Sequence, residues 1–188
     1  MESVEFLVNA KPLITVVHVI SVVFGMGAAL MSDILFTFYG KDRKLSVTEV
    51  STLRILSNVV WISLVVITLS GAGLFFSNVP KYLASVKFLV KMSIMIVLLL
   101  NGFVLHRHVS EQMALPHFLT SPHFAATRRL AFACGAISVI SWIALCTLGV
   151  LDSVSVSYGV LMASYGAVIL CGISVALLVE RKTFAVKK

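Results

Sequence analysis

Long runs of apolar residues alternate with short polar segments along the whole of this 188-residue chain. Each run is about 20 residues long, the length at which an α-helix crosses the ~30 Å hydrocarbon core of a bilayer. Backbone groups in lipid must be paired within their own segment, so helices are the expected structure of every run. The pattern predicts an all-α, polytopic membrane helix bundle with five transmembrane helices. We expect these helices over residues 13–39, 55–77, 84–105, 130–151 and 157–179.

The composition leaves little room for a domain outside the membrane. Hydrophobic residues make up 59% of the chain and charged residues 12%, against about 25% charged residues in an average soluble domain. The longest polar stretch, residues 106–129, is too short to form a core of its own. We therefore predict a single integral membrane domain over residues 1–188. The first apolar run exceeds the core of a secretory signal and lacks a small-x-small cleavage site, so we expect a retained span.

The net charge of +7 does not indicate a nucleic-acid partner. The basic residues flank the predicted helices, where they set topology and contact anionic lipid headgroups. If the N-terminus is outside, the inner segments hold most of the Lys and Arg residues. The positive-inside rule therefore predicts an N-out, C-in orientation, with the lipid bilayer as the main partner.

The sequence lacks the motifs of several enzyme classes and of covalent haem attachment. There is no P-loop, dinucleotide-binding, GxSxG or HExxH pattern, so no enzyme class is assigned. The chain has no CxxCH motif for covalently attached haem. Its three cysteines, Cys134, Cys146 and Cys171, all lie in predicted spans, which favours packing over a disulfide framework.

Small residues at helical spacing predict which faces turn into the bundle. In the first span His18 shares such a stripe with Ser21, Gly25 and Ala29, so we expect its side chain to point inward. The fourth and fifth spans carry similar rows, interpreted as packing faces: Cys134, Ser138, Ser141 and Leu145, then Tyr158, Met162, Tyr165, Ile169 and Gly172.

His18 and Lys91 are ionisable residues at similar depth in the outer half of spans one and three. Ionisable groups inside a membrane are functional candidates. One hypothesis is that the two residues belong to one buried site. A neutral imidazole is a good ligand for haem iron or copper, and Lys91 would be a second axial ligand, a propionate partner or a substrate anchor. The alternative is that Lys91 reaches the headgroups and His18 bonds a neighbouring helix.

A second polar group is expected near the inner ends of spans one to three. Asp33 closes the first span, Arg54 and Asn58 open the second, and Asn101 and His106 close the third. An Asp33–Arg54 or Asp33–Asn58 contact that fixes helix register is one interpretation. The alternative is a pathway for protons or cations.

Soft ligands suggest copper as a second metal. Met92 and Met95 share a helix face, and with Met26, Met31 and His18 they suit Cu(I). The connection between spans three and four repeats Pro-His-Phe at residues 116–118 and 122–124. We interpret it as a loop on the inner membrane surface, with metal binding as the alternative.

Four short motifs resemble those of two bacterial membrane families. They are the segment from His18 to Gly27, Ser70-Gly71, Lys91 after Phe88, and Arg128-Arg129. The two families are the copper resistance protein D family and the membrane-embedded protoporphyrinogen oxidase family. The resemblance covers roughly residues 13–150. The oxidase family implies a bundle that holds haem b, with a first-span His and a third-span Lys essential, which are His18 and Lys91 here. Where that family continues with a Pro-Arg-Leu-type segment, this chain has Met31-Ser32-Asp33.

The leading hypothesis is therefore a haem-b-binding redox protein, or a haem- or copper-handling protein, in the bacterial cytoplasmic (inner) membrane. One alternative is a small ion or solute transporter or channel lined by Asp33, Asn58 and Asn101. Another is a non-catalytic membrane subunit, in a homo-oligomer or in a larger complex.

Overall fold

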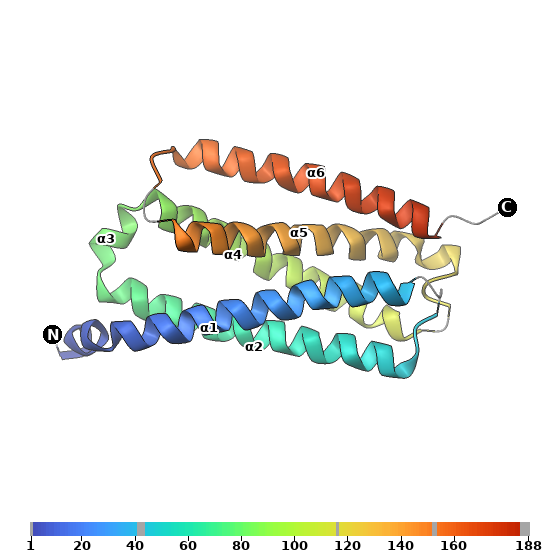
Figure 1. The fold of residues 1–188 in the computed structure, drawn as a ribbon, viewed down its shortest axis with the longest axis horizontal. Helices are drawn as coiled ribbons and strands as arrows, with labels where there is room; N and C mark the ends of the chain where they lie inside the picture. Colours follow the sequence, from blue (N-terminus) through green and yellow to red (C-terminus); the bar gives the residue numbers. More distant parts are fainter. Residues whose placement is uncertain (1, 41–43, 116, 152–153, 185–188) are drawn as a thin grey trace.

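A computed structural model describes the chain except for residues 1, 41–43, 116, 152–153 and 185–188 (Figure 1). The helices longer than ten residues are α1 (Glu2–Tyr39), α2 (Val47–Ser77), α4 (Val86–Leu105), α5 (Ala125–Val150) and α6 (Tyr158–Phe184). The short ones are α3 (Val79–Leu83), a π-helical turn η2 (His106–Ser110), and the 3₁₀ turns η3 (Gln112–Ala114) and η4 (Pro122–Phe124). No strand occurs within these described parts of the chain.

Five helical segments are long and apolar enough to cross a membrane, which confirms the predicted architecture. They are Phe6–Tyr39, Val47–Ser77, Val86–Ala114, Pro122–Val150 and Tyr158–Phe184. Helices α1, α2, α5 and α6 each extend beyond the predicted apolar run at one end, because polar residues add turns there, whereas α4 lies within its predicted run. The N-out orientation stays a prediction.

Local hydrogen bonds explain where α2 and α4 begin. Ser46 and Glu49 form a capping box: the Glu49 amide donates to the Ser46 hydroxyl (3.2 Å), and the Ser46 amide donates to the Glu49 carboxylate (2.7 Å). This box starts α2 eight residues before the predicted apolar run. Ser85 caps α4 by accepting from the Phe88 amide. Asn78 breaks the chain between α2 and α3 and accepts from the Lys81 amide.

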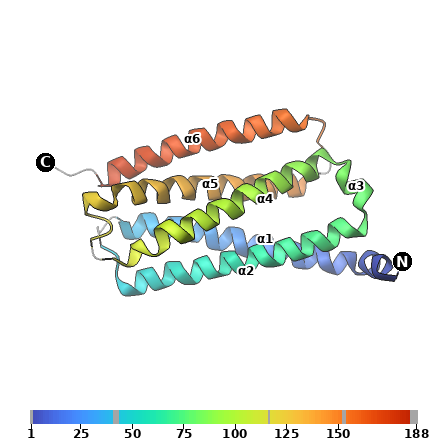
Figure 2. The same cartoon turned by 180° about the vertical axis from the view of Figure 1, so that it is seen from behind.

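The long helices run nearly along one axis as two packed groups (Figures 1 and 2). Helices α1 and α2 form an antiparallel pair that packs along most of its length. Helices α4, α5 and α6 form the other group, with α6 at its outer edge. Helix α3 joins α2 to α4 at one end, where the two groups stand apart. The main backbone packing between the groups is that of α1 on α5.

The interior is a set of three apolar clusters stacked along this axis. The central cluster joins Trp142 of α5 to Leu64 of α2 and to Met95 and Leu98 of α4. A second cluster surrounds Phe118 and Leu119 of the loop, near the C-terminal end of α1. The third holds α4, α5 and α6 together around Val90, Ile94 and Leu148. Gly25 allows the central cluster to close, because a Cβ there would lie 2.6 Å from the Trp142 ring.

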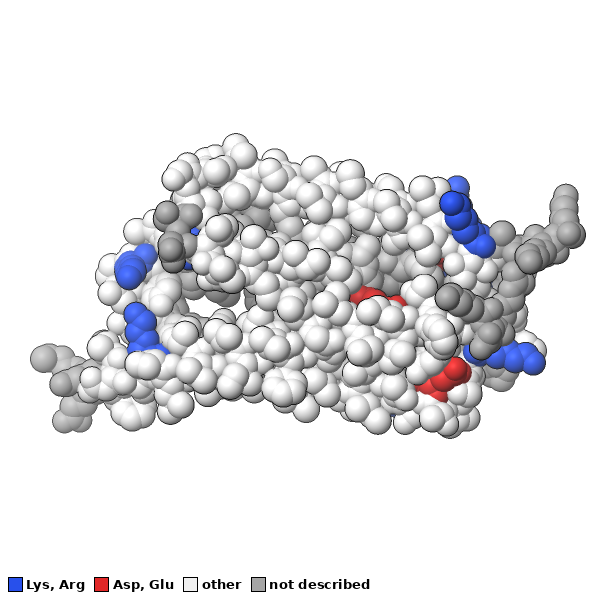
Figure 3. Space-filling view, viewed as in Figure 1, with Lys and Arg blue, Asp and Glu red and all other residues white. Residues whose placement is uncertain are grey.

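Basic and apolar side chains are segregated along the molecule, as a membrane protein requires. Figure 3 shows Lys and Arg gathered at the two ends, with an almost uncharged belt between them. The protein is therefore a multi-pass membrane protein whose belt contacts the bilayer.

Candidate functional site

His18 of α1 points at α2, as its stripe of small residues predicted. Its Nδ1 lies 2.9 Å from the Ser70 hydroxyl. The neighbouring Gly71 lies against the ring, since a Cβ there would be in ordinary contact with His18 Cε1, at 3.6 Å. The imidazole is half-buried. The hydrogen bond thus joins the first and second spans at His18 and Ser70.

The hydroxyl of Ser70 fixes the direction of this hydrogen bond. Ser70 Oγ lies 2.6 Å from the Val66 carbonyl oxygen, so the hydroxyl proton is donated to the backbone. Oγ can then accept from His18 Nδ1, which favours the tautomer with the proton on Nδ1 and the lone pair on Nε2. This is the arrangement that a metal-binding histidine normally has, with one nitrogen held by a hydrogen bond.

Lys91 of α4 lies across the space between the two helix groups. Its ammonium group is near enough to His18 to interact with it electrostatically. Its positive charge would attract a thiolate at Cys146 of α5, whereas it would repel an imidazolium at His18. Helix α4 has little backbone packing on α1 or α2. Figure 3 shows the surface hollowed between the groups toward the α3 end. We use the name outer cleft for the set of His18, Ser70, Lys91 and Cys146, which are linked by the hydrogen bond and the electrostatic interactions above.

Two sulfur atoms meet at the outer cleft. The Cys146 thiol lies 3.4 Å from the Met26 thioether. Met95 is buried nearby in the central cluster. By contrast, Met31 and Met92 are 49% and 42% exposed, so they face away from the bundle. The soft-ligand set expected from the sequence is therefore not assembled as a whole.

Asp33 does not form the expected contact with Arg54 or Asn58. Both of those side chains are exposed on α2, whereas Asp33 turns toward α5. There Asp33 Oδ1 lies 2.9 Å from the position that a Cβ on Gly135 would take. Its Oδ2 is buried and has no hydrogen-bond partner among the described residues.

The other two polar candidates separate from one another. Asn101 is buried and donates to the Cys134 carbonyl oxygen at 3.0 Å. His106 is exposed and begins the π-helical turn that ends α4. A continuous polar path from Asp33 through Asn58 and Asn101 is thus not formed by these side chains.

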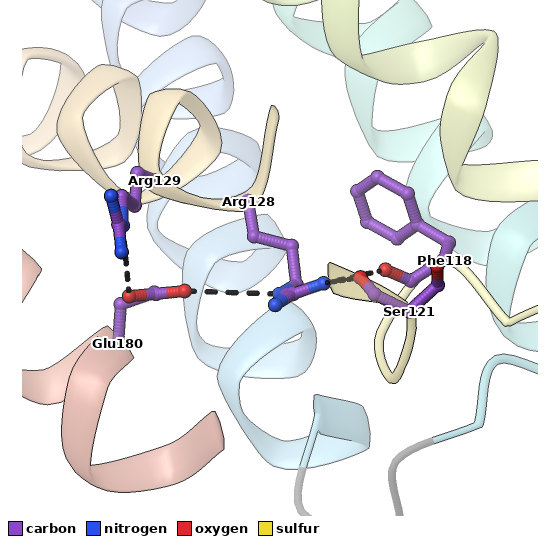
Figure 4. A network of polar contacts seen from close by, with 5 residues as sticks. All are labelled: Phe118, Ser121, Arg128, Arg129 and Glu180. Carbon is purple, nitrogen blue, oxygen red and sulfur yellow. Dashed lines mark hydrogen bonds and ion pairs between the residues drawn. The ribbon is translucent and has the colours of Figure 1, made fainter. Parts of the chain in front are cut away.

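An ionic network that the sequence did not predict joins α5, α6 and the loop (Figure 4). Glu180 of α6 lies 3.7 Å from Arg128 and 3.9 Å from Arg129. Arg128 also donates to the carbonyl oxygens of Phe118 (3.1 Å) and Ser121 (2.8 Å). Glu180 and Arg128 are both buried, with 5% and 7% of their side chains exposed. The network fixes the loop over the end of the bundle.

A protein-only metal site is not found in the described part of the chain. No group of three or more His, Cys, Asp and Glu side chains is close enough there to hold an ion. His117 and His123 of the repeat are exposed on the loop. Phe118 is buried beside Phe124, at 5.6 Å between ring centroids, so this loop packs against the bundle.

Comparisons of the chain with protein-family models, with curated proteins and with solved structures find no match.

Proposed function

We propose that this protein binds haem b in the outer cleft, in the bacterial cytoplasmic membrane, and takes part in electron transfer or haem handling. The observation that supports the proposal is the hydrogen bond between His18 Nδ1 and Ser70, at a half-buried position between α1 and α2. The tautomer that this bond favours leaves the Nε2 lone pair for a metal. Haem iron needs only one or two protein ligands, because the porphyrin supplies four nitrogens.

The surrounding residues fit such a group. Gly71 lies beside the imidazole. Lys91 adds a positive charge near His18, where it would pair with a propionate or act as a second axial ligand. The central cluster packs against Met26, next to Cys146, and would give the haem an apolar neighbour. When bound, the haem would supply the redox chemistry, and the chain would hold it and exclude water.

Absorption spectroscopy tests the proposal directly. The full chain, purified in detergent from haem-replete cells, is expected to show a Soret band. His18→Ala should abolish the band, whereas His106→Ala should retain it, because His106 is exposed at the end of α4. A colourless wild-type protein that does not take up added haem would refute the proposal. Lys91→Met should shift the spectrum if Lys91 ligates iron, and should only weaken binding if it pairs with a propionate.

Copper is a second candidate because of the Met26–Cys146 sulfur contact. Thiolate and thioether ligands select Cu(I). Titration of the purified protein with Cu(I) would then give one equivalent of binding that Cys146→Ser removes. Cys171→Ser is the matched control, since Cys171 is exposed on α6. Equal binding by the two variants would exclude a copper site at Cys146.

A further inference from the structure

Helices α1 and α5 pack closely at two glycines, one on each helix. We call each place a glycine seat, because a side chain of the other helix lies against the glycine. At one, Trp142 of α5 covers Gly25 of α1. At the other, the side chain of Asp33 on α1 occupies the space that Gly135 of α5 leaves open. The two seats are separated by eight residues on α1 and seven on α5, about two helical turns. A residue larger than glycine at position 135 would therefore occupy the place that the Asp33 carboxyl group takes.

One oxygen of this carboxyl group lacks, among the described residues, the donors that an ionised form would need. Oδ2 is inaccessible to solvent and has no hydrogen-bond partner among the described residues. Asn101, the nearby buried amide, donates to the Cys134 carbonyl. An unpaired carboxylate in an apolar interior is strongly disfavoured relative to the neutral acid.

In the part of the chain that the structure describes, the charged and titratable groups around Asp33 do not supply a counter-ion. On α5 the Cys134 thiol faces Asp33 and interacts with it electrostatically. On α1 the Thr37 hydroxyl donates to the Asp33 backbone carbonyl at 2.9 Å. Arg128 and Arg129, nearer the start of α5, are engaged by Glu180. No ion pair with Asp33 is formed within the described residues.

We propose that Asp33 is a proton-binding site inside the membrane. The chemical ligand is the proton itself, exchanged with the aqueous phase at the C-terminal end of α1. That end, Tyr39, is six residues away, or about 9 Å along the helix. This site is separate from the outer cleft, since His18 lies about 22 Å from Asp33 along α1. The inference does not rest on haem binding.

Infrared difference spectroscopy of the full chain in liposomes tests this assignment. At pH 7 the wild type should show the carbonyl stretch of a protonated carboxylic acid, and Asp33→Asn should lack that band. Glu180→Gln is the control: it should remove only carboxylate bands, because Glu180 is paired with two arginines. If Asp33→Asn removes carboxylate bands and leaves every protonated-acid band in place, the proposal is overturned.

A hydrophobic carbodiimide gives a second, chemical readout, because it reacts with protonated carboxyl groups. Mass spectrometry should locate the adduct at Asp33 and not at Glu180, and raising the pH should reduce the yield. Sodium ions at constant pH should not change the yield. Protection of Asp33 by sodium would show that the site binds a metal cation instead of a proton, which would also overturn the proposal.

Discussion

Removing the Glu180 carboxylate should destabilise the protein more than any other single loss of an acidic side chain described here. Glu180→Ala leaves the Arg128 guanidinium buried without its counter-ion, since only 7% of that side chain is exposed. Breaking a buried ion pair by deleting one partner typically costs about 3–5 kcal/mol. Arg128 keeps two carbonyl acceptors, at 3.1 and 2.8 Å, and Arg129 is 58% exposed.

These remaining interactions place the expected cost at the lower end of the range. We expect a loss of about 3 kcal/mol in the free energy of unfolding, or roughly a 150-fold change in the unfolding equilibrium. The two tryptophans, Trp61 and Trp142, report unfolding by fluorescence in mixed micelles of increasing denaturing detergent.

The matched control is Glu111→Ala. Glu111 pairs with Arg107 at 3.6 Å, but these side chains are 72% and 66% exposed. Solvent screens such a pair, so its loss should cost about 0.5 kcal/mol or less. If the two variants unfold within about 0.5 kcal/mol of each other, the reasoning from burial is refuted.

Three further predictions concern packing, ligand geometry and topology. Gly25→Ala should destabilise the bundle by about 1–3 kcal/mol in the same unfolding assay, because a Cβ there would collide with the Trp142 indole. Gly27→Ala is the control and should be nearly neutral, because nothing lies within 4 Å of a Cβ at Gly27. Ser70→Ala should lower haem affinity by about 10–100-fold in a haem titration, because His18 loses the bond that orients it, and an unchanged affinity would contradict this role. In intact spheroplasts a membrane-impermeant maleimide should label Lys81→Cys and not Thr120→Cys, and the reverse pattern would contradict the N-out orientation.

Patterns within one helix were readable from the sequence. Apolar length predicted five spans, and helical spacing predicted that His18, Gly25 and Ala29 face inward. The spacing succeeded because residues three or four apart share a face whatever the partner helix is. It also predicted that Cys134 and Ser141 are buried on α5, which the structure confirms.

Contacts between helices were less accessible to sequence reasoning. Short loops identify neighbouring helices, yet they do not fix the rotation of each helix about its axis. Asp33 therefore faces Gly135 of α5, although Arg54 of α2 was the expected partner. Glu180 was missed for a similar reason. Beside Arg181 and Lys182 it has the sequence of an ordinary interfacial charge cluster, and its partners lie more than 50 residues earlier.

The place of Glu180 near the end of α6 has a consequence for biogenesis. An acid close to the headgroups adds little to the free energy of inserting a helix, and the same holds for arginines in the first turns of α5. Each span can therefore enter the bilayer before its partner is present. Once both have entered, attraction between these charges would draw the end of α6 to α5.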